Sequence, residues 1–174
     1  SADFHYVIGS VHPHTAEYVG RFWRGDPWAF QRDYFDQLAA AAETKLFDCI
    51  AHPDVVKNEV PEAWAPQRVM EDVCRALDRI AATGVALELN TSGAYKSVAE
   101  MNPFPEMLVE MRARGIPVVV GSDAHEPERV GDRFGEALDL LAECGYQYAS
   151  YFMDRTRHDV LIREARLSLL DPVP

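Results

Sequence analysis

Four short apolar segments of this sequence each end directly in side chains that can bind a metal ion or orient a substrate. The segments and the side chains that follow them are 7–11 with His12, 47–51 with His52, 85–89 with Asn90, and 117–122 with Asp123 and His125. Imidazole nitrogens and carboxylate oxygens together suit Zn, Mn or Fe. The carboxyl ends of parallel strands meet at one rim, so residues far apart in sequence become neighbours there. We therefore predict one metal site, formed by the three histidines and the aspartate.

The segment from Gly121 to His125 carries the sharpest signal. Asp123 and His125 stand two residues apart where a strand gives way to a loop, so both can point into the rim and reach adjacent metals. Divalent cations held in this way polarise a phosphoryl oxygen and deprotonate water near neutral pH. We predict Asp123 and His125 as catalytic residues. The alternative interpretation is an aspartate that caps the next helix, beside an incidental surface histidine.

His12 and His52 follow apolar runs in the same manner. Pro53 lacks an N–H and marks the end of its strand, which leaves His52 as the last inward-facing position. Taken singly, a histidine that ends an apolar run is more often a hydrogen-bonded core residue than a ligand. The same placement at three strand ends favours a shared site, which His14 is close enough in sequence to join.

Asn90, Ser92 and Lys57 are the candidates for substrate contact. Asn90 and Ser92 lie in a turn at a strand end, where their donors and acceptors can fix a substrate or support the metal ligands. Lys57, in the loop after His52, can supply positive charge to a phosphate. The alternatives are an ordinary turn and a solvated lysine.

Strand and helix signals alternate along the chain, which is typical of βα units and predicts an α/β fold. Asp26 and Pro27 indicate a helix start, Gly84 and Gly115 indicate helix ends, and Val130 is expected on the apolar stripe of the last helix. The expected elements are strands over 6–11, 47–51, 85–89, 117–122 and 147–152, helices from 26, over 66–84, 105–115 and 130–145, and a short segment at 160–162. Five strands are too few for a closed eight-unit barrel, which leaves an open sheet or part of a larger barrel.

The composition predicts a single domain over residues 1–174 and excludes some partners. The net charge of −11 disfavours nucleic acid, because such a surface repels the phosphate backbone. A small phosphorylated substrate stays compatible, because bound cations reverse the local field. No apolar run approaches membrane-spanning length, and the first residues do not resemble a signal peptide. The three cysteines lie far apart and predict reduced thiols in or near the core of a cytoplasmic protein.

Four segments of the chain resemble the PHP (polymerase and histidinol phosphatase) superfamily, and within it the histidinol-phosphate phosphatase branch. They are Ile8-Gly9-Ser10-Val11-His12, 51–57, 87–93 and 121–131, and they occur in the family's order. The resemblance implies a distorted (β/α)7 barrel with a cluster of divalent metal ions (Zn, Mn or Fe) at the carboxyl rim of its strands. It also implies hydrolysis of a phosphate monoester, with L-histidinol as the product in that branch.

Carried over by position, the resemblance makes His12 and His52 ligands of one metal, Asp123 of a second and His125 of a third. Lys57 falls where the branch has a basic residue that contacts the substrate phosphate. The family's His-x-His motif and its metal-bridging glutamate stand ahead of these segments. We therefore expect the chain to match a barrel without its N-terminal βα units, and to pair with a second copy or a complementing N-terminal segment.

The sequence leaves three interpretations of function open. The first is a histidinol-phosphate phosphatase whose activity is poor in this chain by itself. The second is a PHP-type phosphoesterase that acts on another phosphate ester, such as a nucleotide. The third is a partial PHP domain that acts as a non-catalytic interaction module.

Overall fold

The computed structural model describes residues 3–169, and its centre is a parallel sheet of four strands in the order β1-β2-β3-β4. The strands are β1 (Ile8–Gly9), β2 (Cys49–Ile50), β3 (Ala86–Asn90) and β4 (Val118–Gly121). Chain order and spatial order agree, so each strand lies beside the one before it. In the longest pairing, Leu87 is opposite Val118 and Asn90 is opposite Gly121. An antiparallel hairpin follows, formed by β5 (Tyr148–Met153) and β6 (Thr156–Leu161).

Helices connect the parallel strands, because parallel neighbours need a crossover connection and cannot be joined by a tight turn. They are α1 (Ala16–Phe22), α2 (Pro27–Glu43), α3 (Pro66–Ala81), α4 (Pro105–Ala113), α5 (Phe134–Glu143) and α6 (Ile162–Ser168), with short 3₁₀ turns η1 (Val55–Asn58), η2 (Pro61–Ala63), η3 (Thr91–Tyr95) and η4 (Pro127–Arg129). The start of α2 is as predicted: the Asp26 carboxylate accepts a hydrogen bond from the Trp28 N–H at 3.0 Å, and Pro27 opens the helix.

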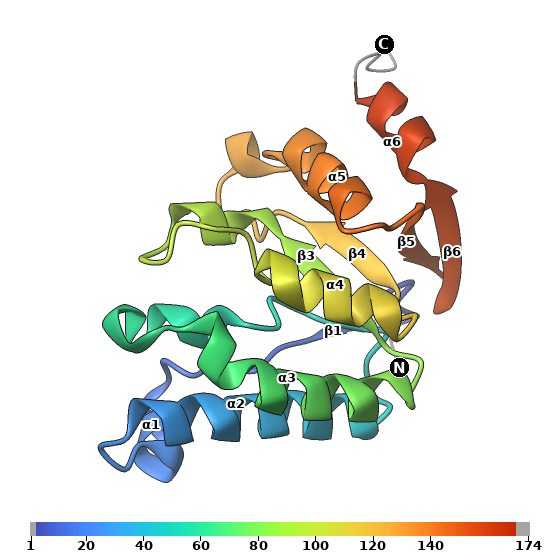
Figure 1. Cartoon of the computed structure of the whole chain (residues 1–174). Helices are drawn as coiled ribbons and strands as arrows, with labels where there is room; N and C mark the ends of the chain where they lie inside the picture. The colour runs from blue at the N-terminus through green and yellow to red at the C-terminus, as the bar shows by residue number, and fades with distance from the viewer. Residues whose placement is uncertain (1–2, 170–174) are drawn as a thin grey trace.

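The helices lie around one side of the sheet, with α3 and α4 in front of it, α2 beside α3, and α5 beyond β4 (Figure 1). The turns that follow β2, β3 and β4 gather at one end of the molecule, at the left of Figure 1. The hairpin lies at the opposite end. The carboxyl ends of the strands therefore share one rim, which is where the sequence predicted the functional residues.

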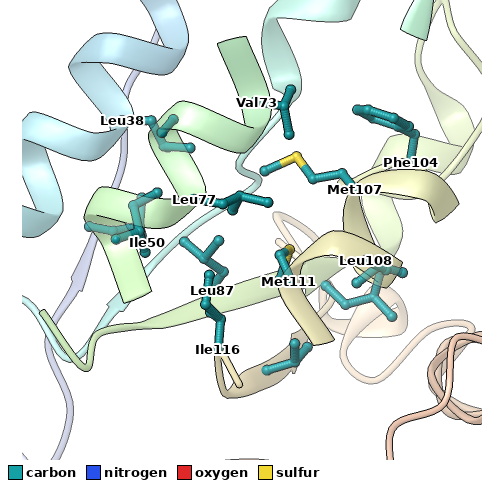
Figure 2. Close-up of a cluster of buried hydrophobic side chains, with 14 of the residues drawn as sticks. Leu38, Ile50, Val73, Leu77, Leu87, Phe104, Met107, Leu108, Met111 and Ile116 are labelled. Carbon is teal, nitrogen blue, oxygen red and sulfur yellow. The ribbon is translucent and has the colours of Figure 1, made fainter. Parts of the chain in front are cut away.

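The core lies between the sheet and the helices. Figure 2 shows Leu77 of α3 and Leu87 of β3 together with side chains of α2 and α4. All five residues of β3 are buried, as predicted for a strand that is covered on both faces. The apolar stripe predicted on α3 is also buried, and comprises Val69, Val73, Leu77 and Ile80. A strand packed in this way provides a rigid base for the residues at its carboxyl end.

The α/β class and the parallel order of the first four predicted strands are confirmed, but several local predictions need correction. The fifth predicted strand, 147–152, corresponds to β5, which lies outside the parallel sheet and pairs antiparallel with β6. The helices α1 and α6 were not predicted, and β6 is longer than the expected segment at 160–162. Val130 is 75% exposed and precedes α5, so its predicted place on the helix stripe is wrong. The positive φ angles of Gly131 (75°) and Arg133 (58°) turn the backbone before the helix begins.

The three cysteines lie in or near the core, as the sequence predicted. Cys49 is buried, Cys74 and Cys144 are partly buried, and all three are free thiols. Within residues 3–169, no helix has both the length and the apolar character needed to cross a bilayer.

Candidate metal centre

The predicted ligands lie at the carboxyl rim of the sheet, and two of them have unusual backbone conformations. His52 follows β2 with φ of 32°, and Asp123 follows β4 with φ of 46°. Positive φ is uncommon for residues other than glycine, and such strain tends to collect at functional sites. At both positions the chain turns sharply where the strand ends. This observation supports a functional assignment for the rim.

His12 and His52 come together although 40 positions separate them in the sequence. Their ring centroids are 5.2 Å apart with an interplanar angle of 64°. His12 is exposed and its Nε2 is 2.7 Å from the Ser10 hydroxyl, whereas His52 is buried. The ring of His14 lies 5.2 Å from that of His12, as its position in the sequence suggested. The structure therefore provides a group of imidazoles at the rim.

Glu88 fixes the backbone on which His52 stands. Its carboxylate oxygen Oε2 accepts hydrogen bonds from the His52 N–H and from the Asn90 side-chain amide, both at 2.9 Å. Its other oxygen lies against β4, because a Cβ built at Gly121 would be 1.9 Å from Oε1. Glu88 thus links the ends of β2, β3 and β4. Only glycine at position 121 leaves room for the carboxylate in this position.

Asp123 and Ser92 meet across the rim, while His125 turns toward solvent. The Ser92 hydroxyl lies 2.7 Å from Asn90 Oδ1 and 3.3 Å from the Asp123 carboxylate, and its single proton can be donated to either oxygen. The His125 Nε2 is 3.7 Å from Asp123 Oδ1, and the His125 side chain is 87% exposed. Asn90 is buried and holds the turn through its side chain. These contacts favour a supporting role for Asn90, and the predicted contacts of Asn90 and Ser92 with a substrate stay predictions.

Lys57 lies away from the solvent and has no free donor. Its side chain is fully buried, and its Nζ donates to Asp54 Oδ2 at 3.0 Å, to Glu100 Oε1 at 3.2 Å and to the Met101 carbonyl at 2.9 Å. An ammonium has three donors, and all three are engaged within the protein. This arrangement favours a structural role, and the predicted contact of Lys57 with a substrate phosphate stays a prediction.

Burial controls the protonation of the site. Burial is the main cause that lowers the pKa of His52 and of His12. A neighbouring histidine lowers each pKa further, because His12 lies beside His52 and His14 lies beside His12. Burial also raises the pKa of Glu88, against the two hydrogen bonds that its carboxylate accepts. A lowered pKa favours the neutral imidazole, which is the form that binds metals.

The histidine pair fits a divalent cation, but the described residues do not close a coordination shell. The Nδ1 atom of His52 is buried and has no hydrogen-bond partner, so it is available to a ligand. Within residues 3–169, however, no three side chains of His, Cys, Asp or Glu converge closely enough to hold a metal ion by themselves. His12 and His52 can be two ligands of one ion, with Asp123 nearby. The predicted assignment of separate metals to Asp123 and His125 is untested.

Sequence reasoning missed Glu88 and Asp54 as organising residues. Both are buried carboxylates, and Asp54 accepts hydrogen bonds from Lys57 and from the Phe104 N–H at 2.8 Å. Glu88 did have a recognisable signal, because it is a charged residue within an otherwise apolar strand. Asp54 had none, because a polar residue after a strand-ending proline is common in loops.

Comparison with known proteins identifies a family profile and two relatives that resemble this sequence. A family profile described as PHP-associated matches residues 110–133, which include the Gly121–His125 segment. A probable histidinol-phosphatase of Deinococcus radiodurans is 39% identical over 149 residues, covering 82% of this chain and 56% of that protein. A probable histidinol-phosphatase of Thermotoga maritima is 27% identical over 125 residues, covering 70% of this chain and 52% of that protein.

Two solved structures share the fold. Histidinol phosphate phosphatase from Lactococcus lactis, crystallised with zinc, L-histidinol and phosphate, superposes with a TM-score of 0.75 at 20% identity, covering 91% of this chain and 63% of that chain. A putative histidinol phosphatase from Listeria monocytogenes superposes with a TM-score of 0.62 at 20% identity, covering 74% and 56%. The chain spans about half the length of the curated relatives that it matches.

The parallel sheet, the histidines at its rim and these relatives together define the class of protein: the chain belongs to the PHP superfamily. Within that superfamily, it belongs to the histidinol-phosphatase branch.

Proposed function

We propose that this chain is part of a metal-dependent phosphatase that hydrolyses L-histidinol phosphate to L-histidinol and phosphate. The observation that carries the proposal is the pairing of His12 and His52, with ring centroids 5.2 Å apart, beside an unpartnered and buried His52 Nδ1. The substrate is proposed by analogy with the curated relatives and with the ligands of the Lactococcus lactis enzyme.

The residues of the rim divide into metal ligands and groups that position them. His12 and His52 would hold a Zn, Mn or Fe ion, which supplies polarisation of a phosphoryl oxygen and a lowered pKa of water when bound. The Glu88 carboxylate accepts a hydrogen bond from the His52 N–H, and the Ser92 hydroxyl lies within hydrogen-bond distance of the Asp123 carboxylate. The His125 imidazole is next to the Asp123 carboxylate, with Nε2 and Oδ1 3.7 Å apart.

The finer description of the fold is also part of this proposal. We propose that the sheet is a portion of a distorted (β/α)7 barrel that forms one domain, since the chain covers 63% of the Lactococcus lactis structure with a TM-score of 0.75. The exposed edge of β1 would then pair with further βα units, or with a second copy of the chain. Three free cysteines favour a reducing compartment, and we propose a cytoplasmic location.

A non-catalytic PHP module is the second candidate, and one observation favours it. Within the described part of the chain no three ligand side chains converge, so a metal held by this chain alone would be bound weakly. Metal content separates the two candidates: several tightly bound ions per molecule, together with hydrolysis of a phosphate ester, would exclude the module.

The test is metal analysis combined with hydrolysis assays on L-histidinol phosphate and on nucleotides. Asp123→Ala should lower the bound Mn²⁺ or Zn²⁺ at equilibrium, because it removes a carboxylate whose charge acts on both His12 and His52. Asp139→Ala is a matched control, since Asp139 lies on α5 and pairs with Arg166. Equal metal content in both variants would contradict the site. Better turnover of nucleotides than of L-histidinol phosphate would contradict the substrate.

A further inference from the structure

One edge of the hairpin strand β6 has no partner strand. Among residues 3–169, β6 pairs only with β5, in a two-stranded sheet that is separate from the parallel one. Residues 156–159 of β6 are all exposed. The strand β5 is held against the rest of the chain, where the Phe152 ring stacks on that of Tyr6 with centroids 5.5 Å apart. The edge of β6 that faces away from β5, here called the outer edge, is therefore a supported template for a further strand.

The hydrogen-bond pattern of the hairpin determines which residues face the outer edge. The Ile162 N–H donates to the Gln147 carbonyl at 3.0 Å, so these two residues form a hydrogen-bonded pair of the ladder. In an antiparallel ladder such pairs alternate with pairs that are not hydrogen-bonded. In the register of β5 and β6, Arg157, Asp159 and Leu161 fall in the second kind of pair. Their N–H and C=O groups therefore point toward the outer edge.

Two copies of the outer edge are complementary in charge. Arg157 and Asp159 share one face of β6, with Nε and Oδ1 3.4 Å apart. In antiparallel pairing about a twofold axis, an outward residue must lie opposite another outward residue, so the register can change only in steps of two residues. Pairing centred on His158 places Arg157 of each copy opposite Asp159 of the other. The two adjacent registers place Arg157 opposite Arg157 or Asp159 opposite Asp159, and like charges directly opposite are destabilising. Charge therefore selects one register.

The other face of the hairpin adds aromatic contacts in the same register. The His158 ring stacks on the Tyr151 ring, with centroids 5.3 Å apart and an interplanar angle of 22°. His158 would lie opposite His158 of the second copy in a pair that is not hydrogen-bonded, where side chains approach most closely. The two stacks would then form one row of four rings across the joined sheet, and such ring pairs add to the energy of burial.

We propose that the outer edge of β6 binds a second copy of this chain, with Arg157 of each copy paired to Asp159 of the other. The two hairpins would form a four-stranded antiparallel sheet, and three or more strands are stable where a lone two-stranded hairpin is marginal. The hairpin lies at the end of the molecule opposite the turns that follow β2, β3 and β4 (Figure 1), so both candidate metal centres stay open. This dimer does not depend on the proposed phosphatase function.

Sedimentation velocity over a range of protein concentrations, at about 0.15 M salt to screen the net charge, measures the dimer. Arg157→Asp and Asp159→Arg should each weaken self-association roughly tenfold or more, because two attractive pairs become two repulsive ones. An equimolar mixture of the two variants should restore the dimer, since every cross-strand pair in the mixed dimer joins opposite charges. The double variant Arg157→Asp/Asp159→Arg should restore it for the same reason.

Two further variants separate this pairing from effects of folding and of net charge. Asp159→Arg also removes the contact with the Ser150 hydroxyl at 2.7 Å. Asp159→Asn keeps an oxygen acceptor there and should weaken the dimer about threefold, since it removes attraction without adding repulsion. Arg24→Asp changes the net charge as Arg157→Asp does and should leave the dimer unchanged, because Arg24 is exposed and follows α1, far from the hairpin (Figure 1).

Several results would overturn the proposal. One is a chain that stays monomeric at every concentration. Another is a dimer that none of the variants of β6 weakens, since it would form through a different surface such as the edge of β1. An equal loss in Arg24→Asp, or a mixture of Arg157→Asp and Asp159→Arg that stays monomeric although both variants are folded by circular dichroism, would also overturn it.

Discussion

Replacing Lys57 by methionine tests whether the buried ammonium is part of the fold or of the substrate site. Methionine has a similar length but no charge, so the Asp54 carboxylate would keep its burial and lose its counter-ion. Both side chains are fully buried, and their charged atoms are 3.0 Å apart. The Glu100 carboxylate and the Met101 carbonyl would each lose a donor as well. The prediction is a large loss of folding stability.

The magnitude follows from what remains buried. Removing one partner of a buried ion pair costs about 3–5 kcal/mol, because an uncompensated charge is left in the interior. A domain has roughly 5–15 kcal/mol of stability in total, so the variant should be close to unfolding. With a urea m-value of about 2 kcal/mol/M, the unfolding midpoint of Lys57→Met should fall by roughly 1.5–2.5 M.

Urea unfolding followed by circular dichroism measures this midpoint. Lys45→Met is the matched control, because Lys45 is exposed and its replacement should stay within about 0.5 kcal/mol of the unaltered protein. The double variant Asp54→Asn/Lys57→Met should recover part of the loss, since it removes the isolated charge. The Asn102 amide nitrogen donates to Asp54 Oδ1, and its own Oδ1 is buried without a partner in the described structure, so the Asn102 amide would turn over to accept a hydrogen bond from the new amide.

One result would refute the reasoning. If Lys57→Met unfolds within about 0.5 kcal/mol of the unaltered protein but binds phosphate more weakly, the ammonium is free in solution and contacts the ligand. That result would restore the prediction made from the sequence.

Two further predictions concern the carboxylate that joins three strand ends. Glu88→Ala should lower the free energy of unfolding by about 2–5 kcal/mol, because it orphans the N–H of His52 and the amide of Asn90; Glu88→Gln keeps an oxygen acceptor and should lose less in the same thermal unfolding assay, so equal losses would be inconsistent with this account. Gly121→Ala should cost about 1–3 kcal/mol, since the new methyl group would lie 1.9 Å from Glu88 Oε1. Most of that cost should vanish in the Glu88→Ala background, and a double-mutant cycle without coupling would contradict the proposed clash.

The sequence determined the elements of this protein wherever local chemistry is decisive. Asp26 and Pro27 specify the start of α2 because a side-chain cap and a fixed φ act within one turn. The apolar run in β3 specifies a strand covered on both faces, because such a pattern is stable only when both sides are buried. The sequence also predicted that His12 and His52 lie at the same rim, since parallel strands align their carboxyl ends.

The tertiary structure alone decided which of the rim residues face one another. The positive charge and loop position of Lys57 predicted a contact with a substrate phosphate. In the structure its neighbours are Asp54, Glu100 and the Met101 carbonyl. The residues of that buried network come from two stretches more than 40 positions apart, and nothing local specifies their approach. The same holds for Glu88, whose partners include the backbone of His52 on the neighbouring strand. Side-chain direction at a strand end depends on long-range packing, and packing is absent from any pattern read along the chain.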